Sequence, residues 1–308
     1  MNSLRISIVQ YLNTVPLVRG FTHGPLRGKY QLSFTVPSQC AEQLRAGQVD
    51  IAIIPAIEVQ RIDNLVVLPG LCIASKKSVR SLLLVSKSPI RDVRRIALDR
   101  SSRSTQALVR ILCEKRWHIS PEFFEADPDL PAMLQKADAA LIIGDPALRL
   151  ALNSESHAKR DAAGDLQILS EFGGIPSSPL FLYDIVEKWR TLTSLPAVLA
   201  VWAARPNAVT PEIIRDFHDS LVFGAQHLHE ISAEASHDLN LPSQKIMRYF
   251  TENIDYTFDE ENLRGLREYF SSAAELGLIS QLLKEIAFAP EPGGLARYED
   301  YIVGQKVL

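Results

Sequence analysis

Residues 101–105 read Ser-Ser-Arg-Ser-Thr and lead into an amphipathic stretch, 104–115, whose apolar residues recur at helical spacing. The first turn of a helix has backbone N–H groups without intrahelical partners, and the helix dipole favours an anion there. With the hydroxyls of Ser104 and Thr105 added, this segment could bind a carboxylate or a phosphate. The alternative, which local sequence favours, is that a serine here only caps the helix.

Two other loops carry polar side chains directly after predicted strands. Asn13 and Thr14 end the first strand and precede a short helix that starts at Pro16. Asparagine offers both a donor and an acceptor and does not titrate, although this pair could also be only a cap. Asp145 follows a buried strand and precedes Pro146, so it is either a general acid or base or a helix cap; local sequence favours the cap.

Several reactive centres have no support in the sequence. The seven histidines show no ligand spacing, and the His-Glu-x-x-His and Cys-x-x-Cys motifs are absent, so we expect no metal site. Gly173-Gly174 lacks the third glycine and the helix register of a phosphate loop. The Gly-x-Ser-x-Gly elbow of serine hydrolases is absent as well.

The elements that must position these residues alternate between short apolar strands and amphipathic helices. Such alternation predicts an α/β fold with largely parallel sheets. The predicted strands are 5–12, 50–54, 81–86, 95–99, 139–143 and 197–203, and the predicted helices are 38–46, 104–115, 211–230, 243–253 and 259–276. Gly47 is expected to end the helix 38–46 at its C′ position.

One internal similarity organises the chain. Segments 41–55 and 130–146 both read as a short helix, a polar turn with aspartate, a buried strand and then proline. We therefore expect two similar lobes that face one another: residues 1–86 plus 203–308, and residues 87–202, with crossings near Val85 and Val201. Ligands bind at the carboxyl ends of strands in open α/β sheets. The predicted interlobe cleft is lined by Asn13, Thr14, Pro55, Ser81, Ser104, Thr105, Gly144 and Asp145.

Composition excludes several classes of protein. A chain of 308 residues with net charge −3 and no long basic stripe is not expected to bind nucleic acid. Its longest apolar runs are far shorter than the roughly 20 residues needed to span a bilayer, so no membrane partner is expected. Three widely spaced cysteines and an N-terminus without signal-peptide character favour the cytoplasm.

Residues 5–17, which include Tyr-Leu-Asn-Thr and Pro16, resemble the N-terminal signature of the chorismate dehydratases, which catalyse the first committed step of the futalosine route to menaquinone. Four further stretches agree with that family: 50–55, 101–108, 140–148 and 192–205. The resemblance implies a two-lobed fold like that of periplasmic binding proteins of the two-crossover type. It also implies a carbon–oxygen lyase that dehydrates chorismate to 3-[(1-carboxyvinyl)oxy]benzoate.

That reaction suits the residues above. Loss of a ring proton and an allylic hydroxyl makes an aromatic ring, so no cofactor and no metal are expected. The substrate is a dianion, and a helix N-terminus with Ser and Thr can bind its carboxylates. Elimination also needs a base and an acid. Either Asp145 is the base, or the substrate's own side-chain carboxylate takes the proton while Asn13 positions it, which is the alternative that we favour.

Two rival functions remain open. The sibling enzyme of the same pathway, which forms dihydroxynaphthoate, resembles this chain in fold, but it carries a histidine where this chain has Gly144 and Asp145. The second rival is a carboxylate-binding protein that returns chorismate unchanged. Such a protein feeding a transporter should be exported, and the sequence shows no signal peptide.

Overall fold

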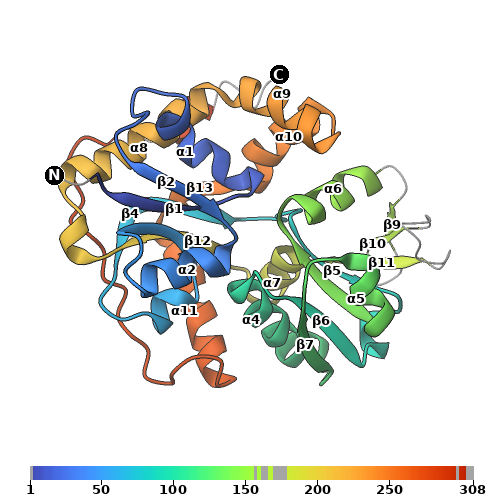
Figure 1. Cartoon of the computed structure of the whole chain (residues 1–308). Coiled ribbons are helices and arrows are strands. Elements are labelled where there is room, and N and C mark those ends of the chain that lie inside the picture. The colour runs from blue at the N-terminus through green and yellow to red at the C-terminus, as the bar shows by residue number, and fades with distance from the viewer. Residues whose placement is uncertain (1–2, 156–157, 161–165, 169–178, 296–297, 303–308) are drawn as a thin grey trace.

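The first lobe is built on a six-stranded mixed sheet with strand order β13-β4-β12-β3-β1-β2 (Figure 1). The computed structural model describes residues 3–155, 158–160, 166–168, 179–295 and 298–302. The strands of this sheet are β1 (Arg5–Val9), β2 (Gln31–Thr35), β3 (Ile51–Pro55), β4 (Val66–Ser75), β12 (Ala197–Ala204) and β13 (Asp255–Phe258). β1 is parallel to β2 and β3. The other pairs, β12 with β3, β12 with β4 and β13 with β4, are antiparallel.

The second lobe is built on a seven-stranded sheet with strand order β7-β6-β8-β5-β11-β10-β9. Its strands are β5 (Leu82–Ser86), β6 (Arg95–Asp99), β7 (Glu122–Ala126), β8 (Ala139–Ile143), β9 (Ala158–Arg160), β10 (Leu166–Ile168) and β11 (Leu180–Asp184). Among the described strand pairs of this sheet, only β6–β7 and β6–β8 are parallel. The expectation of largely parallel sheets is therefore wrong. β5 and β8 pair antiparallel although both are buried along their whole length. Continuous apolar strands usually indicate a parallel sheet, so their composition was misleading here.

Helices cover the two sheets (Figure 1). The α-helices are α1 (Val15–Thr22), α2 (Pro37–Arg45), α3 (Glu58–Arg61), α4 (Arg103–Leu112), α5 (Leu130–Lys136), α6 (Gly144–Ser154), α7 (Ile185–Thr193), α8 (Pro211–Gln226), α9 (Leu228–Leu239), α10 (Ser243–Arg248), α11 (Glu260–Glu275) and α12 (Glu299–Ile302). Short turns of 3-10 helix are η1 (Leu12–Thr14), η2 (Ile90–Asp92) and η4 (Pro206–Ala208), and π-turns are η3 (Cys113–Trp117) and η5 (Tyr249–Asn253). Within the described ranges, no helix has both the length and the apolar character needed to cross a membrane.

The predicted repeat is present in three dimensions. The order β2-β1-β3-β12 of the first sheet is matched by β7-β6-β8-β5 of the second. The aspartate of each polar turn also makes the same contacts. Asp50 accepts a hydrogen bond from the backbone N–H of Arg5 at 2.8 Å and donates its own N–H to the Arg5 carbonyl. Asp138 does the same with Arg95, its carboxylate lying 3.0 Å from the Arg95 nitrogen. We call these two contacts the Asp–Arg clamps.

The crossings between the sheets differ from the predicted positions near Val85 and Val201, which lie inside strands. β5, placed by the sequence in the range 1–86, pairs with β8 and β11 of the second sheet. Most of β12 falls within the predicted range 87–202, yet β12 pairs with β3 and β4 of the first sheet. The crossings therefore lie at 76–81 and between β11 and β12. Both strands are apolar, so their own residues do not indicate which sheet they join.

Candidate active site

A small cavity between the two lobes brings together five of the predicted site residues. These residues are Asn13, Pro55, Ser104, Thr105 and Gly144. The rest of this interlobe cavity is lined by Val9, Tyr11, Pro37, Ile73, Leu82, Ser102, Ile143, Leu199 and Ala200. Its volume is about 50 Å³, far below the roughly 300–1,000 Å³ of typical small-molecule sites. The lobes are therefore closed over a space smaller than an organic substrate needs.

Helix α4 brings the buried hydroxyls of Ser104 and Thr105 to this cavity, and the hydrogen bonds that both accept leave their protons free to donate. Ser102 occupies the N-cap position, but its hydroxyl makes no capping bond and instead donates to Oγ1 of Thr105 at 2.8 Å. Oγ of Ser104 accepts from the backbone N–H of Ile57 in the other lobe at 3.1 Å. No described residue accepts the proton of either Ser104 or Thr105. Each hydroxyl thus has a proton to donate at the N-terminus of a ten-residue helix, which suits a carboxylate.

Asn13 faces the same cavity from η1 in the first lobe. Its carbonyl accepts a hydrogen bond from the Tyr256 hydroxyl at 2.8 Å, and its Oδ1 accepts from the Thr14 hydroxyl at 3.3 Å. Among the described residues, none accepts a hydrogen bond from Nδ2 of Asn13. The side chain is therefore held through its oxygen and leaves two amide protons for a ligand.

Two predicted binding residues support the cavity from outside its lining. Thr14, buried at the N-cap of α1, makes no capping bond with its side chain and orients Asn13 instead. Ser81 is buried behind Gly144: its carbonyl accepts the Gly144 N–H at 2.8 Å, and its hydroxyl accepts from Tyr249 at 2.9 Å. Neither side chain lines the interlobe cavity.

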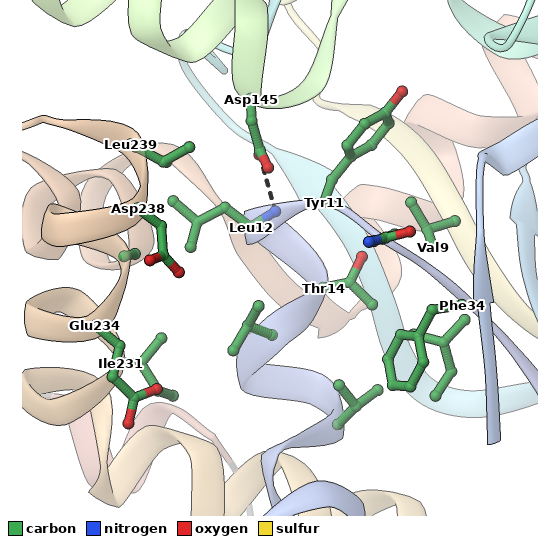
Figure 2. Close-up of a pocket in the computed structure, with 15 residues that line it drawn as sticks. Val9, Tyr11, Leu12, Thr14, Phe34, Asp145, Ile231, Glu234, Asp238 and Leu239 are labelled. Carbon is green, nitrogen blue, oxygen red and sulfur yellow. Dashed lines mark hydrogen bonds between the residues drawn. The ribbon is translucent and has the colours of Figure 1, made fainter.

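Asp145 points away from the cavity and clasps the other lobe. Its Oδ1 accepts a hydrogen bond from the backbone N–H of Leu12 at 2.9 Å, as the dashed line in Figure 2 shows. The expectation that Asp145 caps a helix is wrong, because α6 begins one residue earlier and the carboxylate bonds to the neighbouring lobe. Burial raises the pKa of Asp145, and the Leu12 N–H only partly opposes this rise.

Asp145 and Thr14 line a second cavity, which we call the acidic pocket (Figure 2). Its volume is about 300 Å³, and its lining includes the carboxylates of Asp145, Glu234 and Asp238. By contrast, none of the described residues that line the interlobe cavity has a charged side chain. Electrostatics therefore favours an anion at the interlobe cavity, with its neutral donors and helix N-terminus, over the acidic pocket.

Sequence reasoning missed two residues at this site. The ring of Tyr11 packs on Gly144, where a Cβ atom would lie only 2.6 Å from Cε1 of the tyrosine. Asp99, fully buried at the end of β6, accepts from both the N–H and the hydroxyl of Ser101, at 2.9 and 2.6 Å. The available signal was position: Tyr11 stands two residues before Asn13, and Asp99 two residues before Ser101.

Ion pairs and backbone bonds hold the lobes together around the cavity. Arg103 of α4 reaches the first lobe and contacts Glu42 at 2.6 Å and Glu58 at 3.3 Å. The N–H of Ser38 donates to the carbonyl of Ser101 at 3.1 Å. These contacts, together with the bond from Leu12 to Asp145, join the two lobes on both sides of the cavity.

Two mixed sheets joined by two crossings, with a cavity between them, define the two-lobed class of periplasmic-binding-protein folds. Solved structures agree: AF1704 from Archaeoglobus fulgidus superposes with a TM-score of 0.67 at 18% identity, over 90% of this chain and 98% of that one. The aliphatic sulphonate binding protein SsuA from Escherichia coli gives a TM-score of 0.57 at 17% identity, over 96% of each chain.

The model of the menaquinone biosynthesis family matches residues 4–275, and the chain belongs to that family. A chorismate dehydratase from Thermus thermophilus is 24% identical over 282 residues, which cover 89% of this chain and 95% of that protein. The resemblance to the chorismate dehydratases is thereby confirmed, and a role in menaquinone biosynthesis follows from the family.

Proposed function

We propose that this protein is a chorismate dehydratase, a carbon–oxygen lyase that converts chorismate to 3-[(1-carboxyvinyl)oxy]benzoate and water. The observation that carries the proposal is the neutral interlobe cavity, where Ser104 and Thr105 present hydroxyl protons at the start of α4. A carboxylate held there receives the helix dipole and charge-assisted hydrogen bonds. Membership of the menaquinone biosynthesis family supports a substrate from that pathway.

The proposed mechanism uses the substrate's own side-chain carboxylate as the base. Asn13, with two unused amide protons, holds that carboxylate beside the ring C–H, and Thr14 holds Asn13. Asp145 takes no part in proton transfer, because its carboxylate bonds to Leu12 and lines the other pocket. Positioning of reacting groups can supply several kcal/mol, so an amide is sufficient on the protein side.

We further propose how the site opens. The lobes, revised to residues 3–75 plus 197–302 and residues 82–193, separate about the segments 76–81 and 194–196. The motive is the cavity volume of about 50 Å³, which must grow before chorismate can enter. The cytoplasm is the compartment we propose, since the three cysteines Cys40, Cys72 and Cys113 are all free and buried, as suits a reducing environment.

The structural neighbours favour one other function. SsuA is by its name a binding protein, so a protein that captures chorismate without changing it remains the second candidate. The two differ in one observable: an enzyme consumes the ring diene, and a binding protein does not.

Incubation of the purified protein with chorismate, followed by diene absorbance and product mass, tests the proposal. We expect multiple turnovers and a product lighter than chorismate by one water. Stoichiometric binding with intact chorismate would instead establish the binding protein. A larger menaquinone precursor run in parallel covers the sibling dihydroxynaphthoate-forming enzyme, and its turnover in place of chorismate would overturn the proposal.

A further inference from the structure

Elimination of water needs a proton for the departing hydroxyl as well as a base, and the interlobe cavity limits which group can provide it. The described residues that line this cavity include a single titratable side chain, that of Tyr11. The remaining polar side chains are the amide of Asn13 and the hydroxyls of Ser102, Ser104 and Thr105. These groups position a ligand but are poor acids.

Tyr11 is held at the boundary between the lobes. Its ring packs on Gly144, a residue whose φ of +68° and missing Cβ together leave room for the ring. Its hydroxyl lies 3.5 Å from Oγ of Ser101, a distance at the limit of a hydrogen bond. Tyr11 also lines the acidic pocket, and in Figure 2 its hydroxyl points away from Thr14.

Ser101 controls the direction of the Tyr11 proton. The Ser101 hydroxyl donates to Oδ1 of Asp99 at 2.6 Å, so its oxygen can only accept from Tyr11. At 3.5 Å this acceptor holds the tyrosine proton weakly. A substrate oxygen placed closer than Ser101 would therefore capture that proton.

We propose that Tyr11 is a catalytic residue that donates its hydroxyl proton to the leaving oxygen of chorismate, with Ser101 and Asp99 as positioning residues. This inference rests on the proposed function. As the ring C–H bond breaks, its electron pair forms a ring double bond, and the C–O bond breaks towards oxygen. That oxygen takes the Tyr11 proton and leaves as water. The substrate carboxylic acid formed by the same step then returns its proton to the phenolate, so the protein ends unchanged.

The surroundings of Tyr11 keep it a donor. Burial, with a smaller contribution from the carboxylates of Asp99 on β6 and Asp145 on α6, raises the pKa of Tyr11 to about 12 against the opposing effect of the Ser101 contact. The phenol therefore carries its proton throughout the neutral range. A transient phenolate at this site is also a strong base, which favours its rapid reprotonation.

The first test compares wild-type protein with Tyr11→Phe, which keeps the ring on Gly144 and removes only the hydroxyl. We expect kcat to fall about 10²-fold or more while KM for chorismate stays within a few-fold. A kcat within threefold of wild type would overturn the role of Tyr11. Failure of the wild-type protein to turn over chorismate would instead overturn the proposed function, so the two failures are distinguishable.

The second test replaces Tyr11 by 3,5-difluorotyrosine, which keeps the hydroxyl and lowers its pKa. The alkaline limb of kcat should move to lower pH in this protein. An unmoved limb would contradict the proposal even if Tyr11→Phe fails to fold. Ser101→Ala should shift the same limb and lower kcat less than Tyr11→Phe does, and an effect on KM alone would show that Ser101 serves binding.

Discussion

Oδ1 of Asp145 lies 2.9 Å from the backbone nitrogen of Leu12, and this bond joins the start of α6 in one lobe to η1 in the other. The next residue after Leu12 is Asn13, which faces the interlobe cavity. Asp145, which the local sequence indicated as a base or a helix cap, thus holds the backbone beside Asn13, the proposed positioning residue. Its variants separate a structural role from a chemical one.

Asp145→Asn should keep kcat within a few-fold of wild type, because the amide oxygen can still accept from Leu12. Asp145→Ala should raise KM, since the orphaned Leu12 N–H costs about 1–3 kcal/mol in the closed state. Steady-state kinetics on both variants checks this. A folded Asp145→Asn protein that binds chorismate normally and is inactive would restore Asp145 as the base.

Thr105→Val should lower kcat/KM about 10- to 100-fold. The substitution keeps the shape of the side chain and removes a hydrogen bond to a charged group, which is worth roughly 1.5–3 kcal/mol. Thr105→Ser retains the hydroxyl and serves as the matched control. Equal kcat/KM for Thr105→Val and wild type would remove Thr105 from the substrate site.

Asn13→Ala should lower kcat about 100-fold or more, because the substrate carboxylate loses the group that holds it beside the C–H bond. Thr14→Val, which removes the hydroxyl that donates to Oδ1 of Asn13, should have a smaller effect in the same direction. Rapid-quench measurement of a single turnover isolates this step from product release. Loss of binding with an unchanged single-turnover rate would count against a positioning role.

Gly144→Ala should destabilise the protein and disturb Tyr11. Residues other than glycine pay about 1–3 kcal/mol for such a left-handed backbone, and here the added Cβ also meets the tyrosine ring. Gly47→Ala is the matched control, because Gly47 has the same φ of +68° with nothing within 4 Å of its Cβ position. Urea unfolding should show a larger loss of unfolding free energy for Gly144→Ala than for Gly47→Ala. Equal losses would show that the contact with Tyr11 does not restrict the side chain at position 144.

The pair of Glu42 with Arg103 should make stability depend on pH. The Arg103 guanidinium lowers the pKa of Glu42 below 4.5, with help from Arg45. A carboxyl group with a lowered pKa stabilises the folded state above its unfolded pKa, and this contribution is lost as the pH falls through the folded pKa. Glu42→Gln should therefore narrow the gap in unfolding free energy between neutral and acid pH. Urea unfolding at pH 7 and at several pH values below 5 measures this difference in unfolding free energy. An equal difference for Glu42→Gln and wild type would contradict the prediction.

Features set by neighbouring residues could be predicted from the sequence, whereas features set by distant segments could not. The ranges 95–99 and 139–143 are β6 and β8 to the residue, because short apolar runs with polar ends have little freedom. Gly47 follows α2 at the C′ position as expected, with positive φ. The sheet to which β5 belongs could not be predicted, since pairing is a property of two distant segments.

The candidate site divides in the same way. Loops after parallel strands predict that Asn13, Pro55, Ser104, Thr105 and Gly144 converge, and these residues line one cavity. The direction in which a side chain points is set by partners across the lobes, such as Leu12 for Asp145. Tyr11 could not be assigned a role from the sequence, because the residues that hold it, Gly144 and Ser101, lie in the other lobe.

The two Asp–Arg clamps tie down the amino ends of β1 and β6, while Asn13 and Ser104 lie beyond their carboxyl ends. Five residues of strand, roughly 17 Å, separate the two ends. Substitutions beyond the carboxyl ends of these strands therefore leave the Asp–Arg clamps at the amino ends, which set the strand register, unchanged. This modularity gives the scaffold mutational tolerance: the loops after the strands can change while the frame persists, even among chains that share fewer than one residue in five.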